Sequence, residues 1–119
     1  MYLSDIVEAA DAIARFISGI SWDRFRDDEL VQSAVLQKLM IVGESASRLS
    51  DKFKSARSEM PWKDIVGFRN IAIHAYFSVD WQIVWKAATM NAPELRQRIA
   101  RILETDYPET YEKFVARKP

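Results

Sequence analysis

Apolar residues recur at helical spacing along nearly the whole of this 119-residue chain. No stretch alternates apolar and polar residues for long enough to indicate a β-strand. A stripe of apolar residues every three or four positions has to be buried against other helices. The sequence therefore predicts an all-α fold, an up-and-down bundle of four to five helices that forms a single domain over residues 1–119.

Capping residues and helix breakers divide the chain into the expected helices. The expected starts are Ser4, Asp27 or Asp28, Pro61, Ser78 or Asp80, and Pro93. Gly19 is placed to end the first helix, and the second is expected to run to about Phe53. Because proline cannot continue a helix, a break is expected near Asn91, and the last helix runs to about Leu103.

Three shorter segments carry weaker signals. Residues 21–26 are expected to form a connector, with Trp22 and Phe25 packing back on the core. Residues 52–60 are expected to be irregular and basic. The tail after Leu103 is expected to add one helical turn at residues 111–114.

A glycine followed by a glutamate interrupts the apolar face of the second helix. Gly43 costs roughly 1 kcal/mol relative to alanine inside a helix, so another backbone or a ligand is expected to approach closely there. Glu44 and the small residues after it indicate a tight helix–helix contact with one acid directed at a partner. A simply solvated glutamate is the alternative.

Composition excludes several classes of protein. The 17 basic and 17 acidic side chains give a net charge of zero, so a nucleic-acid site has to be a local patch. With no cysteine and one histidine, a disulfide framework is impossible and a zinc site made of protein ligands alone is not expected. Residues 1–5 lack the features of a signal peptide, and no apolar run is long enough to span a membrane. These features are typical of a cytoplasmic protein that binds no membrane.

The single histidine lies in an otherwise apolar stretch, residues 67–77, that carries three other polar side chains. At about 100° per residue, Asn70 lies about 100° and His74 about 140° from Arg69, with Tyr76 about 20° to the other side. One half of this helix therefore presents a cation, an amide, an imidazole and a phenol, and the other half is apolar.

Arg69 and His74 together have the chemistry to cleave RNA without a metal ion. The imidazole titrates near neutrality and can take the 2′-OH proton, after which that oxygen attacks the adjacent phosphorus. The guanidinium stabilises the charge that develops on the phosphate, and Asn70 orients the imidazole or donates to phosphate. The alternatives are a structural His74, an Arg69 that only pairs with Glu44, and a half-buried Tyr76. Since one imidazole supplies one proton-transfer group, a homodimer is expected to supply a second His74.

The stretch from Arg69 to Tyr76 fits the R-x-x-x-x-H-x-Y motif and resembles the HepT-type toxins, a branch of the HEPN superfamily. Residues 41–50 resemble that family's Gly-Glu-Ala segment, which is followed by a basic residue and leucine. Residues 61–70, 79–85 and 93–95 are similar to its approach to the motif and its closing helices. Ala75 and Phe68 depart from the residues common at their positions, and both exchanges are apolar.

The resemblance implies a HEPN-like bundle that dimerises, with Arg69 and His74 as catalytic residues of a metal-independent ribonuclease toxin. Asn70 and Glu44 are expected to support them. It also implies an MntA-type nucleotidyltransferase antitoxin that uses ATP and magnesium to attach AMP to Tyr76, while this chain itself needs no cofactor. A non-catalytic, nucleotide-binding subunit of a two-protein nucleotidyltransferase is the alternative. The basic residues Lys52, Lys54, Arg57 and Lys63 either line the RNA cleft or are simply solvated.

Overall fold

The computed structural model describes residues 1–73 and 80–115, and every regular element in these ranges is helical. The elements are α1 (Tyr2–Phe16), α2 (Trp22–Asp27), α3 (Glu29–Ser47), α4 (Asp51–Ser55), α5 (Trp62–Ile73), α6 (Trp81–Lys86), η1 (Ala87–Asn91), α7 (Ala92–Asp106) and α8 (Pro108–Phe114). This confirms the predicted all-α, HEPN-like bundle. Within the same ranges, no helix has the length and apolar character needed to cross a bilayer.

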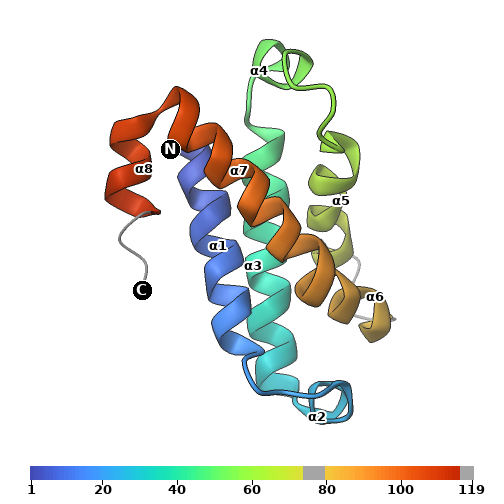
Figure 1. Cartoon of the computed structure of the whole chain (residues 1–119). Helices are drawn as coiled ribbons and strands as arrows, with labels where there is room; N and C mark the ends of the chain where they lie inside the picture. The colour runs from blue at the N-terminus through green and yellow to red at the C-terminus, as the bar shows by residue number, and fades with distance from the viewer. Residues whose placement is uncertain (74–79, 116–119) are drawn as a thin grey trace.

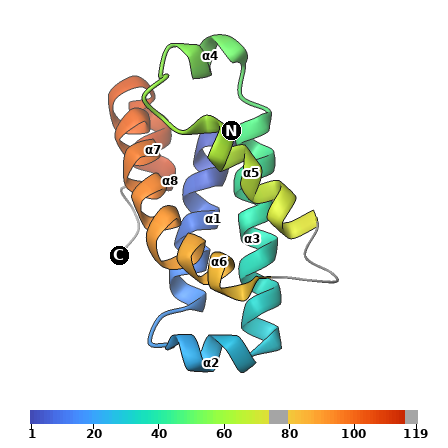
Figure 2. The same ribbon diagram turned by 90° about the vertical axis from the view of Figure 1, so that its right-hand side faces the viewer.

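Helix α3 is the centre of the bundle. It packs against α1 on one side and α5 on the other, and α7 packs across α1 (Figure 1). The short helices α2 and α4 lie at opposite ends of α3, and α8 turns back against α7 and α1 (Figure 2). The helix that carries Arg69 is therefore held mainly by α3, which also carries Gly43 and Glu44.

Two clusters of buried side chains form the core. One joins α1, α3, α5 and α7, and the other joins α1, α2, α3 and the α6–η1 segment. Phe68 is partly buried and packs against both clusters. Since Phe68 directly precedes Arg69 in the chain, core packing fixes the position of the helix turn that presents the arginine.

The connector predicted at residues 21–26 is instead helical. Ser21 accepts a hydrogen bond from the backbone N–H of Arg24 and so caps α2. The prediction that its aromatic residues pack back on the core is confirmed, because Phe25 is fully buried with its ring centroid 4.9 Å from that of Trp85. Tertiary packing of aromatic rings therefore stabilises a helix too short to be stable alone.

Three predicted helix boundaries were wrong. Helix α1 ends at Phe16, three residues before Gly19. Helix α1 begins at Tyr2, and Ser4 lies inside its first turn, donating to the carbonyl of Met1 at 2.8 Å. Helix α3 ends at Ser47 and does not reach Phe53, because Ser50 caps the separate helix α4 by accepting from the N–H of Phe53. The prediction that residues 52–60 are irregular was therefore wrong for its first part, which is helical through Ser55. Two other predicted caps are confirmed, since Asp28 begins α3 and Asp80 begins α6.

The break predicted near Asn91 is a π-helical turn rather than an interruption. Residues Ala87–Asn91 form this turn, and the N–H of Ala92 bonds to the carbonyl of Ala87, five residues back. A π turn accommodates Pro93, which lacks the N–H that an α-helix needs, without ending the rod from α6 to α7. The helical turn predicted for the tail is confirmed as part of α8.

Candidate active site

The site is built where α5 crosses α3 at Gly43. A Cβ atom at Gly43 would lie 2.4 Å from the backbone nitrogen of Arg69 and 3.0 Å from its Cα. Such distances are far inside van der Waals contact, so only glycine permits this crossing. The predicted close approach at Gly43 is confirmed, and the approaching backbone is that of Arg69 on α5.

Glu44, the residue after this glycine, pairs with the motif arginine. The Nη1 of Arg69 donates to Oε2 of Glu44 at 3.2 Å and to the Ser47 hydroxyl at 3.4 Å. The Arg69 side chain is 36% exposed and that of Glu44 is 41% exposed. Of the two alternatives that the sequence left open, the structure therefore shows the paired Glu44, which holds a guanidinium that solvent and solutes can still reach.

Sequence reasoning gave no separate role to Ser47, the last residue of α3, or to Arg48, which follows it. Arg48 donates from Nε to Oε1 of Glu44 at 3.2 Å, so one carboxylate binds two guanidiniums. Ser47 donates from its hydroxyl to the carbonyl of Glu44 at 2.7 Å, which orients its oxygen toward Arg69. The spacing of four residues from Glu44 to Arg48 is the signal that could have revealed this pair.

Asn70 takes no part in the contact between Arg69 and Glu44. It is exposed and lines a broad hollow together with Trp62 and Gly67 of the same helix. No side-chain hydrogen bond of Asn70 is found within residues 1–73 and 80–115. The structure therefore brings Glu44 and Arg69 into contact, and leaves Asn70 beside them facing solvent.

The four basic residues at and before the start of α5 have different surroundings. Arg57 pairs with Asp106 and lies 3.9 Å from the centroid of the Phe53 ring, which indicates a structural role. Lys54 donates to the carbonyl of Ala46 at 3.3 Å. Lys54 and Lys63 also line the hollow that contains Asn70. Lys52 is exposed, and the prediction that these basic residues line an RNA cleft stays a prediction.

Two of the predicted site residues, His74 and Tyr76, lie outside the described residues, which omit positions 74–79. The neighbouring Ala75 lies outside them as well. The predicted convergence of the imidazole and the phenol with Arg69 therefore stays a prediction. What the described part of the motif contributes is Arg69 in place on α5, five positions before the histidine in the sequence.

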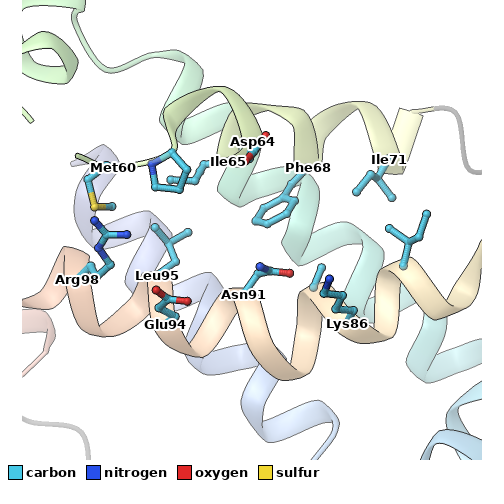
Figure 3. A pocket seen from close by; sticks show the side chains of 13 residues that line it. Met60, Asp64, Ile65, Phe68, Ile71, Lys86, Asn91, Glu94, Leu95 and Arg98 are labelled. Carbon is cyan, nitrogen blue, oxygen red and sulfur yellow. The ribbon is translucent and has the colours of Figure 1, made fainter. Parts of the chain in front are cut away.

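A cavity of about 360 Å³ lies on another face of α5, between this helix and the α6–η1–α7 rod. Figure 3 shows Phe68 pointing into it from α5, with the amide of Asn91 opposite. Apolar residues such as Ile65 and Leu95 form its walls, and neither Arg69 nor Asn70 lines it. The cavity is therefore separate from the surface that presents the motif arginine.

The chemistry available at the α3–α5 crossing is anion binding. A guanidinium is permanently charged and presents a planar fork of donors that matches phosphate oxygens. Glu44 orients the Arg69 guanidinium through one nitrogen, and the side chain remains partly exposed. A phosphate at this position would be held, and charge developing on it would be stabilised, by a group already fixed in place.

Comparison with known proteins places these residues within a family pattern. The sequence model of the family described as ribonuclease HepT-like matches residues 6–102, which include the α3–α5 crossing and the whole motif. No solved structure is significantly similar to this chain.

Individual relatives of this chain also carry ribonuclease names. The chain is 35% identical over 101 residues to "Probable ribonuclease HepT" of Thermococcus cleftensis, covering 85% of this chain and 92% of that protein. It is 32% identical over 98 residues to "Putative RNase MJ1380" of Methanocaldococcus jannaschii, covering 82% of this chain and 90% of the relative. The similarity thus extends over most of each protein.

Proposed function

The chain belongs to the HepT-like ribonuclease family, and we propose that it is the toxin of a toxin–antitoxin pair, an RNA endonuclease that needs no metal ion. The observation that carries this proposal is Arg69, held on the α3–α5 crossing by Glu44 yet partly exposed, five residues before the only histidine. We propose the cytoplasm as its location, where its RNA substrate is found.

The proposed reaction uses the 2′-hydroxyl of RNA as the nucleophile. His74 takes the proton of the 2′-OH, the 2′-oxygen attacks the adjacent phosphorus, and Arg69 stabilises the negative charge that builds on the phosphate oxygens. The bond from phosphorus to the 5′-oxygen breaks, and that oxygen takes a proton from a second group. The products are a 2′,3′-cyclic phosphate and a 5′-hydroxyl, so DNA is not a substrate.

A homodimer is the proposed source of the second proton-transfer group. The chain has one histidine, and efficient cleavage uses one group to accept a proton and another to donate one. A two-fold axis that brings two copies of the motif together would supply the partner subunit's His74. A fully active monomer in solution would contradict this part of the proposal.

Cleavage of single-stranded RNA by the purified protein in excess EDTA tests the proposed reaction. We expect cleavage to continue without free metal ions, and an RNA with 2′-deoxyribose at the cut position to stay intact. A His74→Ala preparation purified in the same way controls for contaminating nucleases. If EDTA abolishes cleavage, or the deoxy-substituted RNA is cut equally well, the proposed chemistry is wrong.

We further propose that an MntA-type nucleotidyltransferase inactivates the protein by attaching AMP to Tyr76. The phenol oxygen would attack the α-phosphate of ATP and release pyrophosphate, with ATP and Mg²⁺ used by the partner enzyme. The added phosphate would occupy the anion site of Arg69 and repel RNA. The nucleotide that this chain is proposed to hold is the AMP attached covalently to Tyr76. The chain is expected to need no cofactor of its own.

Intact mass spectrometry tests this regulation. Protein made together with the partner is expected to be heavier by whole AMP units than protein made alone, and Tyr76→Phe is expected to abolish the shift. Phenylalanine keeps the ring and removes only the oxygen that would be modified. A Tyr76→Phe protein that still gains the same mass would place the modification elsewhere.

The zero net charge favours a second candidate, a non-catalytic helical subunit of a two-protein nucleotidyltransferase, because no domain-wide field attracts RNA. The two candidates differ in their behaviour with purified components. RNA cleavage that requires His74 excludes the second candidate. AMP transfer to this chain with no RNA cleavage by the unmodified dimer would favour it.

A further inference from the structure

The carboxylate of Glu44 is shared between two guanidiniums from different helices. Arg69 of α5 binds Oε2, and Arg48, the residue that follows the last turn of α3, binds Oε1, each at 3.2 Å. Two positive charges and one negative charge give this cluster a net charge of +1. An anion that binds at Arg69 therefore also approaches a second cation on the neighbouring helix.

Arg48 is more exposed than its partners. Its side chain is 59% exposed, against 36% for Arg69. An exposed ion pair four residues apart on a helix contributes little to stability and is screened by salt, so folding alone gives little reason for it. The contact to Glu44 uses the Nε of Arg48, whereas a guanidinium has five N–H donors. Arg48 therefore keeps donors for a ligand while it stays oriented.

The charges of the whole chain make such a local cluster important. The net charge is zero, so attraction of a polyanion depends on cations that lie close together. Both guanidiniums bind one carboxylate, so they lie within roughly one Debye length, about 8 Å at physiological ionic strength. A strand that places one phosphate at Arg69 brings its next phosphate into the field of Arg48.

We propose that Arg48 is a substrate-binding residue that contacts the RNA phosphate next to the one held by Arg69. Glu44 is then the positioning residue that keeps both guanidiniums on the same side of the α3–α5 crossing. The role of Arg48 rests on the proposed ribonuclease function and deepens it, because it assigns a binding site for a second phosphate of the same strand.

The test is the salt dependence of RNA binding in a His74→Ala background, which keeps the RNA intact. Fluorescence anisotropy of a labelled single-stranded RNA gives the binding constant between about 50 and 200 mM salt. A plot of the logarithm of that constant against the logarithm of the salt concentration falls, and each lost phosphate contact makes it less steep by about 0.7. We expect Arg48→Ala to lose about one contact and Arg48→Lys to keep most of it. Arg24→Ala on α2 removes the same charge at the opposite end of the bundle and is expected to leave the slope unchanged (Figure 1).

Cleavage kinetics in a protein that keeps His74 distinguish a role of Arg48 in RNA binding from a role in folding. Arg48→Ala is expected to raise KM with kcat and the melting temperature nearly unchanged, since it removes binding common to ground and transition states. If wild type cleaves RNA and Arg48→Ala matches Arg24→Ala in slope and KM, the role of Arg48 is overturned and the ribonuclease function stands. If no RNA is cleaved while Arg48→Ala still weakens RNA binding, the role of Arg48 is supported and the ribonuclease proposal fails. Absence of any RNA binding by wild type overturns both.

Discussion

Replacement of Arg69 by alanine is expected to lower kcat/KM for RNA cleavage roughly 10²- to 10³-fold, the loss typical of removing one preorganised group that stabilises transition-state charge. The folded state should change little. Alanine keeps the Cβ atom that packs at the Gly43 crossing, and the lost ion pair with Glu44 is partly exposed, so it contributes about 1 kcal/mol or less. Initial rates of cleavage and a thermal melt of the same preparation check both parts.

Two further variants make this result specific to the proposed chemistry. Arg69→Lys keeps the charge but loses the planar fork, so it should recover only part of the activity. If Arg69 and His74 act as a unit, the double alanine variant should lose about as much as the worse single variant. A shared catalytic role would be contradicted if the loss of kcat/KM in the double variant equalled the product of the two single losses. It would also be contradicted if Arg69→Ala cleaved RNA at the wild-type rate.

A methyl group at Gly43 is expected to cost roughly 1–3 kcal/mol of stability, because it overpacks the α3–α5 crossing. Its Cβ would lie 2.4 Å from the Arg69 nitrogen, which is backbone and cannot rotate away. Helix α5 therefore has to shift, and a displacement of about 1 Å at a catalytic group can cost about 10²-fold in rate. Gly43→Ala should thus lower both the melting temperature and kcat/KM.

The matched control is Gly67→Ala on α5. Within the described part of the chain, apart from its two neighbours and the nearby backbone of α5, no atom lies within 4 Å of a Cβ built at Gly67. Alanine there should therefore raise helix stability by roughly 0.5–1 kcal/mol. The melting temperatures of both variants are measured at the same protein concentration, so that any dimerisation shifts them equally. Equal melting temperatures for the two variants would show that the crossing is looser than the structure indicates.

Local chemistry allowed much of this fold to be predicted. Helical periodicity depends only on the spacing of apolar residues, and Asp28 and Asp80 cap helices through bonds to residues two or three positions ahead. The close approach at Gly43 could be predicted because a glycine inside a helix lowers stability and usually marks a place where another group comes near. The ribonuclease family could be predicted from the motif and its flanking segments, and the match to the family model confirms it.

Other features depend on contacts between distant segments. Helix α2 is held by aromatic packing of Phe25 against Trp85, which no local pattern announces. Nothing in the spacing of α3 could decide between a solvated Glu44 and one paired with Arg69, twenty-five positions away. The π turn that replaces the expected break reflects a rod kept continuous by its buried alanines, including Ala87 and Ala88.

The sequence by itself thus determined the helical class, the close approach at Gly43 and the residue types that could cleave RNA, because each depends on neighbouring positions or on a motif. Tertiary structure alone decided which helix approaches Gly43, that Glu44 joins Arg69 to Arg48, and that Asn70 lines a hollow with Trp62 and Gly67. The physical reason is that a carboxylate takes its partners from whichever helix the core packing places beside it, and that choice is made across the bundle.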